Sequence, residues 1–179
     1  FEAGAGFNIE DINAFNLEGK LDLAALRLAF NALLVRHESL RTRFVVMDGE
    51  PRQIIDPAAS VAFNLKYQDL RESEVTENEV KAMVVSHSNE LFDLQFDMLI
   101  RAVLLQTTDT HYVFVLTMHH IISDGWSMDV MIREVLTFYE VFRKGGSDPL
   151  PPLAIHYKDY ATWQQSQLEE ENILPHRNY

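Results

Sequence analysis

One stretch of this sequence gathers residues that could do chemistry: His119, His120, Asp124 and Gly125, within the run Met118–Ser127. The stretch follows a long apolar run and precedes a helical pattern, so its polar residues are expected in the loop after a strand, where reactive groups are common. An imidazole can take up or release a proton near neutral pH, and a glycine permits a tight turn or the close approach of a substrate. These residue types therefore favour proton-transfer chemistry about as much as a purely structural role.

Three kinds of site compete for this stretch. A metal site is disfavoured because neighbouring strand residues point to opposite faces, so His119 and His120 cannot easily share an ion, and the chain has no Cys. A hydrolase triad is disfavoured because no G-x-S-x-G elbow occurs and neither Ser123 nor Ser127 has its context. The third kind is a single catalytic histidine in acyl transfer, with both reactants supplied from outside. In that case one histidine faces a cleft, the other packs into the fold, and Asp124 holds the loop by an ion pair.

The elements that must position this stretch follow from hydrophobic periodicity and turn signals. The predicted helices are Leu23–Arg36 with Asp22 as its N-cap, Glu77–Leu91, Ser127–Lys144 and Ile155–Glu171. The predicted strands are Asn13–Leu17, Phe44–Met47 with Gln53–Ile55 across Asp48-Gly49, Val61–Leu70, and the pair Ile100–Gln106 and Tyr112–His119. This mixture of hairpins and helices predicts an α+β fold, with a mixed β-sheet and flanking helices.

Composition and charge narrow the class of protein. The chain has 179 residues, of which 47% are hydrophobic and 23% charged, as in a domain with a packed core. The net charge of −12 argues against nucleic acid as a partner. No apolar run approaches the ~20 residues of a membrane span, and no signal peptide is recognisable, so we expect no membrane partner and a cytoplasmic location. Because there is no initiator Met, Phe1 is expected to be an interior point of a longer protein.

Three motifs together resemble those of the condensation domains of nonribosomal peptide synthetases. The run from His119 to Gly125 resembles their HHxxxDG motif, Arg36–Phe44 resembles RHExLRTxF, and Tyr157–Trp163 resembles YxDxAxW, all in the family's order. The resemblance covers nearly the whole chain, although the family's earliest motif, around AQ-R-W, is absent. It implies a chloramphenicol-acetyltransferase-like lobe: an N-terminal lobe over residues 1–152, and an exit segment over 153–179 towards a C-terminal lobe that this chain lacks.

The resemblance also implies a role for each residue of the central motif. His120 matches the histidine that faces the substrate tunnel, where it deprotonates the acceptor amine, or orients it and stabilises the transition state. Gly125 would offer its backbone N–H to the tetrahedral intermediate. His119 would be structural, and Asp124 would be structural and paired to an arginine, for which Arg41 is the candidate. No metal is expected.

The aromatic residues of the motifs are expected to be architectural. Trp126 should pack the start of its helix, and Tyr157, Asp159 and Trp163 should form a helix start and an aromatic anchor. Because the second lobe supplies much of the substrate tunnel in this family, an isolated chain of this extent is expected to be inactive and to expose the surface between the lobes.

The implied reaction is amide-bond formation between a carrier-bound acyl or peptidyl thioester and a carrier-bound aminoacyl amine. The substrates would arrive on phosphopantetheine arms, and the chain would bind no cofactor itself. Its expected partners are the upstream and downstream peptidyl carrier proteins, the adenylation domain and the C-terminal lobe. Two alternatives stay open: an epimerisation domain of the same fold, which the Gly after the motif Asp disfavours, and a non-catalytic domain that recruits partners, which the intact His-His-Asp set disfavours.

Overall fold

The computed structural model describes residues 2–4 and 14–167. Its centre is a five-stranded sheet in the order β1-β2-β7-β6-β5. The strands are β1 (Glu2–Gly4), β2 (Ala14–Glu18), β5 (Leu65–Asp69), β6 (Ile100–Gln106) and β7 (His111–Met118). The sheet is mixed, because β5 pairs parallel to β6 while the other pairs are antiparallel.

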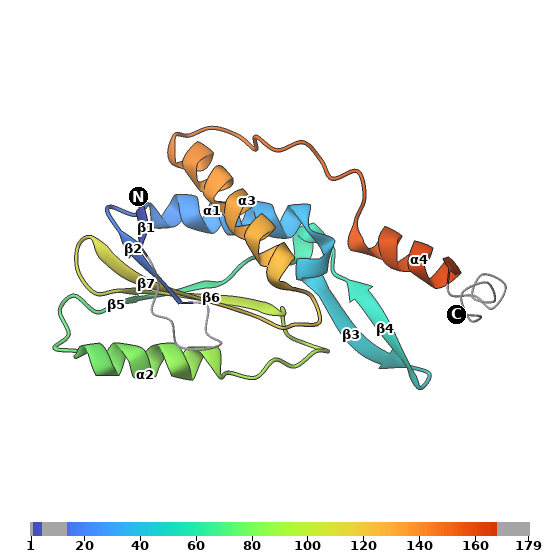
Figure 1. Cartoon of the computed structure of the whole chain (residues 1–179), viewed down its shortest axis with the longest axis horizontal. Helices are drawn as coiled ribbons and strands as arrows, with labels where there is room; N and C mark the ends of the chain where they lie inside the picture. Colours follow the sequence, from blue (N-terminus) through green and yellow to red (C-terminus); the bar gives the residue numbers. More distant parts are fainter. Residues whose placement is uncertain (1, 5–13, 168–179) are drawn as a thin grey trace, which may run out of the picture.

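Helices cover both faces of this sheet. Helices α1 (Leu23–Arg36) and α3 (Gly125–Arg143) lie over one face, and α2 (Glu77–Ser88) lies over the other (Figure 1). Residues of β6 are therefore buried almost without interruption, as expected for a strand that is covered on both faces. The predicted α+β fold with a mixed sheet and flanking helices is confirmed.

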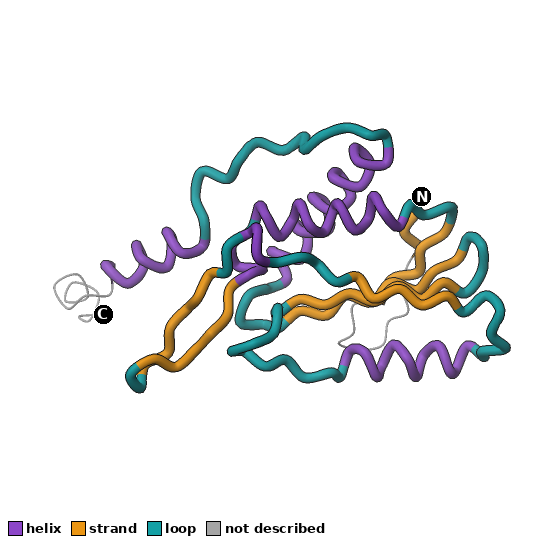
Figure 2. The backbone as a smooth tube through the Cα atoms, turned by 180° about the vertical axis from the view of Figure 1, so that it is seen from behind, coloured by secondary structure: helices purple, strands orange, loops and turns teal. Residues whose placement is uncertain are grey.

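A separate two-stranded ribbon and a last helix lie beside this layered body (Figure 2). The ribbon pairs β3 (Thr42–Met47) with β4 (Glu50–Ile55) across the turn at Asp48-Gly49, where both residues have positive φ, as a tight hairpin turn requires. Two short 3₁₀ helices flank the ribbon, η1 (Glu38–Arg41) and η2 (Ala58–Ser60). Helix α4 (Tyr157–Gln167) follows an extended linker.

The predicted elements agree with the structure where their end signals are strong. The bounds predicted for α1 are those observed, and the Asp22 side chain accepts the Ala25 N–H at 2.9 Å as its N-cap. Strand β5 begins at Leu65 rather than Val61, and α2 ends at Ser88. Residue 13 and residues 168–171 of the predictions lie outside the described residues, and the domain division at 152 stays a prediction.

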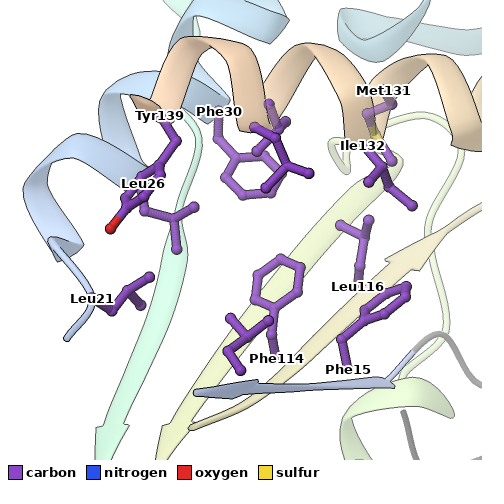
Figure 3. Close-up of a pocket in the computed structure, with 12 residues that line it drawn as sticks. Phe15, Leu21, Leu26, Phe30, Phe114, Leu116, Met131, Ile132 and Tyr139 are labelled. Carbon is purple, nitrogen blue, oxygen red and sulfur yellow. The ribbon is translucent and has the colours of Figure 1, made fainter. Parts of the chain in front are cut away.

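The core between α1, α3 and the sheet leaves an apolar cavity (Figure 3). Side chains of both helices and of β2 and β7 line it, among them Phe15, Phe30, Phe114 and Met131. Tyr139 also lines it, and its hydroxyl is turned to the backbone, where it accepts the Asp22 N–H at 3.0 Å. This cavity offers no group for chemistry. No helix in the described ranges is long and apolar enough to cross a membrane.

Candidate active site

All three sequence motifs line one open pocket. Its walls are η1 with the facing side chains of the β3–β4 ribbon, the loop after β7 with the start of α3, and the start of α4. The lining residues are Glu38, Ser39, Thr42, Phe44, Gln53, Ile55, His120, Ile121, Ile122, Ser123, Asp124, Trp126, Ser127, Tyr157 and Lys158. Motifs that are far apart in sequence therefore meet at one place, which makes this pocket the candidate active site.

The imidazole of His120 is one of the titratable side chains that line this pocket. It is exposed, lies in the turn that follows β7, and lines the pocket. Its Nδ1 atom lies 3.4 Å from the Ser123 carbonyl oxygen, a long hydrogen bond. Since a carbonyl oxygen can only accept, Nδ1 is the donor in this contact, and the neutral ring keeps the lone pair of Nε2 for another partner.

His119 has different surroundings. The ring is half-buried, its Nδ1 accepts the Ile121 N–H at 3.0 Å, and it packs edge-on against Phe92 with a centroid distance of 6.1 Å. Arg101 covers the Phe92 ring, 4.1 Å from its centroid, so His119 is tied into a packed cluster. Strand alternation predicts opposite orientations for the two rings. However, β7 ends at Met118, so the turn, not the pleat of a strand, separates the two rings.

Asp124 is the N-cap of α3 and forms a reciprocal capping box with Ser127. The Asp124 carboxylate accepts the Ser127 N–H at 2.8 Å, and the Asp124 N–H donates to the Ser127 hydroxyl at 2.7 Å. The hydrogen bond from the Ser127 backbone N–H, followed by that from its side chain, lowers the pKa of Asp124 below the usual range. Local hydrogen bonds therefore hold this carboxylate at the helix start.

The predicted ion pair between Asp124 and Arg41 is wrong. Arg41 donates from Nε to the Leu34 carbonyl at 3.2 Å, donates from its guanidinium to the Asp56 carbonyl, and lies 3.6 Å from the Glu38 carboxylate. Its side chain is only 11% exposed. The physical reason is that the chain turns back directly after α1, so Arg41 folds onto the backbone carbonyls of its own neighbourhood. Its role is to join α1, η1 and the end of β4.

Gly125 is the first residue of α3 and lies between Asp124 and Trp126, which line the pocket, but it is not itself a lining residue. Its backbone φ is not positive, and a Cβ atom built on it would meet nothing within 4 Å. The tight-turn explanation for this glycine is therefore not supported, and close approach of another molecule is the explanation that remains. The hydrogen bonds of the described residues leave its N–H without a protein partner, as expected at a helix N-terminus.

The expected packing of Trp126 against the start of its helix is wrong, whereas the expected helix start at Tyr157 and Asp159 is observed. Trp126 is 78% exposed rather than packed on its helix, and α4 has no buried residue. Tyr157, Tyr160 and Trp163 form a row along α4, with centroid separations of 6.0 and 5.7 Å, and all three are exposed. Asp159 does act at the helix start, since its carboxylate accepts the His156 N–H at 2.9 Å.

Sequence reasoning missed two contacts that frame the pocket. Lys158 donates to Glu38 Oε1 at 2.9 Å, and this hydrogen bond, ahead of the nearby positive charges, lowers the pKa of Glu38. Glu134 of α3 contacts both Arg36 and His37 at the end of α1. A signal for Glu134 was present, because it lies three residues after buried Met131, on the edge of the apolar stripe of α3.

The site's chemistry rests on imidazole, carboxylate and backbone N–H groups. Over residues 2–4 and 14–167, no group of three His, Cys, Asp or Glu side chains is arranged to hold a metal ion. One exposed imidazole beside a helix N-terminus can accept a proton from a substrate, and the helix N-terminus favours negative charge that develops next to it.

Comparison with known proteins gives one consistent family. The Condensation domain family matches residues 9–179. A linear gramicidin synthase of Brevibacillus parabrevis is 41% identical over 175 residues, which cover 96% of this chain and 3% of that protein. Malpibaldin synthetase of Mortierella alpina is 41% identical over 161 residues, which cover 90% of this chain and 3% of that protein. The chain thus spans a few per cent of the length of these curated relatives.

Solved structures share the fold. The X-domain from teicoplanin biosynthesis is 34% identical and superposes with a TM-score of 0.80, covering 89% of this chain and 34% of that chain. The epimerization domain from the third module of tyrocidine synthetase B is 22% identical, with a TM-score of 0.79, covering 92% of this chain and 37% of that chain. The described fold therefore corresponds to about a third of each of these domains.

Proposed function

The chain belongs to the condensation-domain family of nonribosomal peptide synthetases, and we propose that it carries the catalytic histidine of a domain that forms amide bonds. The acceptor is the amine of a carrier-bound aminoacyl group, and the donor is an acyl or peptidyl thioester on an upstream carrier. Peptidyl carrier proteins deliver both on phosphopantetheine arms, and this chain supplies no cofactor of its own. The C-terminal lobe and the adenylation domain of the same synthetase are the remaining partners, and a cytoplasmic location belongs to this proposal.

The position of His120 carries the proposal. Its ring is exposed at the pocket where the three motifs meet, and its Nδ1–H donates to the Ser123 carbonyl. Nε2 then has a free lone pair for the proton of the attacking amine. An α-amino group ordinarily has a pKa of roughly 7.7–8.0 and an imidazole one of about 6.5, so the transfer is feasible near neutral pH. A positioned base of this kind contributes about 10²–10⁴ in rate.

The amine nitrogen attacks the thioester carbonyl, a C–N bond forms, and the carbonyl oxygen becomes an oxyanion. As the C–S bond breaks, the thiolate of the donor arm leaves, and it takes the proton that His120 received from the amine. His120 acts either as this base or by orienting the amine and stabilising the transition state, and both require the same exposed ring.

Gly125 is the proposed donor to the oxyanion. Its N–H has no protein partner and lies at the N-terminus of a 19-residue helix, where the helix dipole favours negative charge. Backbone donors of this kind act when they lie about 2.7–3.1 Å from the developing oxyanion. Such a distance requires the thioester to approach the glycine closely, in agreement with the open space beside its Cα atom.

A non-catalytic, partner-recruiting domain is the second candidate. The observation that favours it is the 34% identity to the X-domain from teicoplanin biosynthesis, a domain also solved in complex with OxyB. Against it, this chain keeps both histidines, the aspartate and the glycine of the motif. The epimerisation alternative has less support, because the relationship to the epimerization domain is 22% identity and carries the fold alone.

A coupling assay on the synthetase module that contains this chain tests the proposal. Defined donor and acceptor groups are loaded on the two carriers, and the amide product is measured by mass spectrometry. His120→Ala is expected to lower the rate by about 10²–10⁴. His111→Ala is the matched control, since His111 is an exposed histidine at the opposite end of β7. Wild-type rates in the His120 variant would remove this residue as the chemical group, and a wild-type module that binds a partner protein but couples nothing would favour the recruiting candidate.

A further inference from the structure

The Glu134 carboxylate is hydrogen-bonded to two side chains at the end of α1. Arg36 Nε donates to Glu134 Oε1 at 3.0 Å, and His37 Nε2 lies 2.5 Å from Glu134 Oε2. The three side chains are only 12–22% exposed, so this is a partly buried, charge-assisted cluster rather than a surface ion pair. Each carboxylate oxygen of Glu134, in the middle of α3, is thus hydrogen-bonded to one of the consecutive residues Arg36 and His37.

The cluster has a specific electrostatic reason to form. Arg36 is the last residue of α1 and His37 is its C-cap, so Glu134 faces a helix C-terminus, which carries partial negative charge. A carboxylate alone would be unfavourable there. The positive charge of the Arg36 guanidinium compensates for the Glu134 carboxylate and for the partial negative charge of the helix end. Its NH1 group also donates to the Pro151 carbonyl of the linker after α3.

The same three residues connect the two walls of the candidate active site. Glu38, the first pocket residue of η1, follows His37 directly in the chain. Glu134 lies nine residues after Gly125 in the same helix, about 14 Å along its axis. Because a helix is stiff over this length, fixing Glu134 against residues 36 and 37 fixes the start of α3 against η1.

We propose that Glu134 is a positioning residue for the reaction: it holds the start of α3, with Gly125 and the adjoining loop that carries His120, in register with the pocket wall that begins at Glu38. The inference rests on the proposed function, because register at this pocket affects a rate only where the reaction occurs there. Glu134 touches neither substrate nor the reacting atoms, and it acts through the helix.

Glu134→Gln in the intact synthetase module provides the kinetic test. Glutamine keeps the shape of the side chain and removes its charge. We expect kcat for coupling to fall about tenfold or more, because small misplacements of reacting groups are costly. The KM for the acceptor carrier should stay within about twofold, since no contact with the carrier is removed. Glu134→Asp, which keeps the charge, should recover part of the loss.

Glu140→Gln is the matched control on the same helix. Glu140 pairs with Arg143 and Lys144 at the exposed face, at 3.1 and 3.5 Å, so removing its charge should leave kcat unchanged. A folded Glu134→Gln module with wild-type kcat would overturn the proposal, and so would an equal loss in the Glu140 variant. If Glu134→Gln does not fold, His37→Ala removes one of the two donors and should lower kcat by a smaller factor, whereas wild-type kcat in that variant would overturn the proposal.

A second measurement separates this inference from the proposed function. In the 179-residue chain, the backbone amide NMR signals of Gly125 and Ser127 should move in Glu134→Gln and stay in place in Glu140→Gln. If the wild-type module forms no amide, the proposed function fails, and these signals alone decide whether Glu134 sets the register of α3. Unmoved signals in a folded Glu134→Gln chain would overturn the positioning role.

Discussion

Asp124 and Ser127 cap each other at the start of α3, with the Ser127 N–H donating to the Asp124 carboxylate at 2.8 Å and the Asp124 N–H donating to the Ser127 hydroxyl at 2.7 Å. The aspartate of the central motif therefore has a local function that requires no distant partner. It orients the first turn of the helix whose N-terminus lines the pocket, directly beside the turn that carries His120.

Asp124→Ala is expected to lower the unfolding midpoint by about 2–4 °C, as loss of a helix N-cap does in a chain of this size. Asp124→Asn should unfold close to the wild-type temperature, because asparagine caps helices about as well as aspartate. Thermal unfolding followed by circular dichroism measures both. A loss in the Asn variant as large as in the Ala variant would mean that the negative charge has a partner beyond Ser127.

Arg41→Ala should be much more destabilising, by about 2–4 kcal/mol, because the guanidinium is 11% exposed and serves two carbonyls and a carboxylate. Arg52→Ala is the control: Arg52 pairs with Glu50 at the exposed surface, and its loss should cost no more than about 0.5 kcal/mol.

The double variant Arg41→Ala/Asp124→Ala tests whether Arg41 and Asp124 interact. Since no contact joins the two side chains, the two losses of stability should add in chemical denaturation. A double variant clearly milder than the sum of the single variants would restore the pairing between Arg41 and Asp124 that the sequence suggested.

Features that depend on residues close in sequence could be predicted from the sequence, and features that depend on contacts between distant residues could not. Elements with a strong periodicity and a local cap, such as α1 with Asp22, were predicted to the residue. The resemblance to a family predicted that His120 faces a substrate tunnel, but the meeting of three motifs at one pocket was not predicted, because it depends on contacts between distant segments. The partner of Arg41 could not be predicted, because it consists mainly of backbone carbonyls, which every residue offers equally. Likewise, exposure of Trp126 and of the α4 aromatics contradicts their apolar character, so composition gave no signal for it.

His119→Ala removes the acceptor of the Ile121 N–H and the edge contact with Phe92, so it should destabilise the chain by about 1–2 kcal/mol. His119→Asn should recover part of this loss, because the asparagine Oδ1 can occupy nearly the place of Nδ1 and accept the same N–H. Hydrogen exchange at Ile121 gives the site-specific measurement. Equal exchange rates in the two variants would mean that the ring's packing, and not its nitrogen, holds the turn.

The Glu38–Lys158 contact predicts a pH dependence with a definite sign. The hydrogen bond from Lys158, followed by the surrounding positive charges, lowers the pKa of Glu38 in the folded chain. The contact therefore stabilises the fold above the ordinary carboxyl pKa of about 4.3, and this contribution is lost as the pH falls through the lowered value. Its size should be modest, at most about 1 kcal/mol, since Lys158 is 49% exposed.

Lys158→Met tests this directly, with the Glu38 carboxyl followed by carbon-detected NMR titration. The pKa of Glu38 should rise towards its ordinary range, and the start of α4 should lose order because α4 has no buried residue to hold it. Lys144→Met, at an exposed position with a 3.5 Å contact to Glu140, should leave the Glu38 titration unchanged. An unchanged Glu38 titration in the Lys158 variant would assign the lowered pKa to Arg41 and His156 instead.

Gly125→Ala separates folding from chemistry at the pocket. The φ of Gly125 is not positive and its surroundings are open, so a methyl group should leave the unfolding midpoint unchanged or slightly higher, since alanine favours a helix over glycine. Gly145→Ala, just past the other end of α3, gives the contrast: its φ of +74° is costly for alanine, and the expected loss is about 1 kcal/mol.

The rate of amide formation should be affected in the opposite way to stability. Gly125→Ala should lower this rate about tenfold or more, whereas Gly145→Ala should leave it close to that of the wild type. The alanine variant keeps its N–H, so it removes no donor. A thioester oxygen about 2.7–3.1 Å from that N–H would, however, bring the substrate against the added methyl group. Steady-state rates with defined carrier-bound substrates measure the effect. Full activity in Gly125→Ala would mean that the substrate does not approach this N–H, and the oxyanion would then need a donor other than the start of α3.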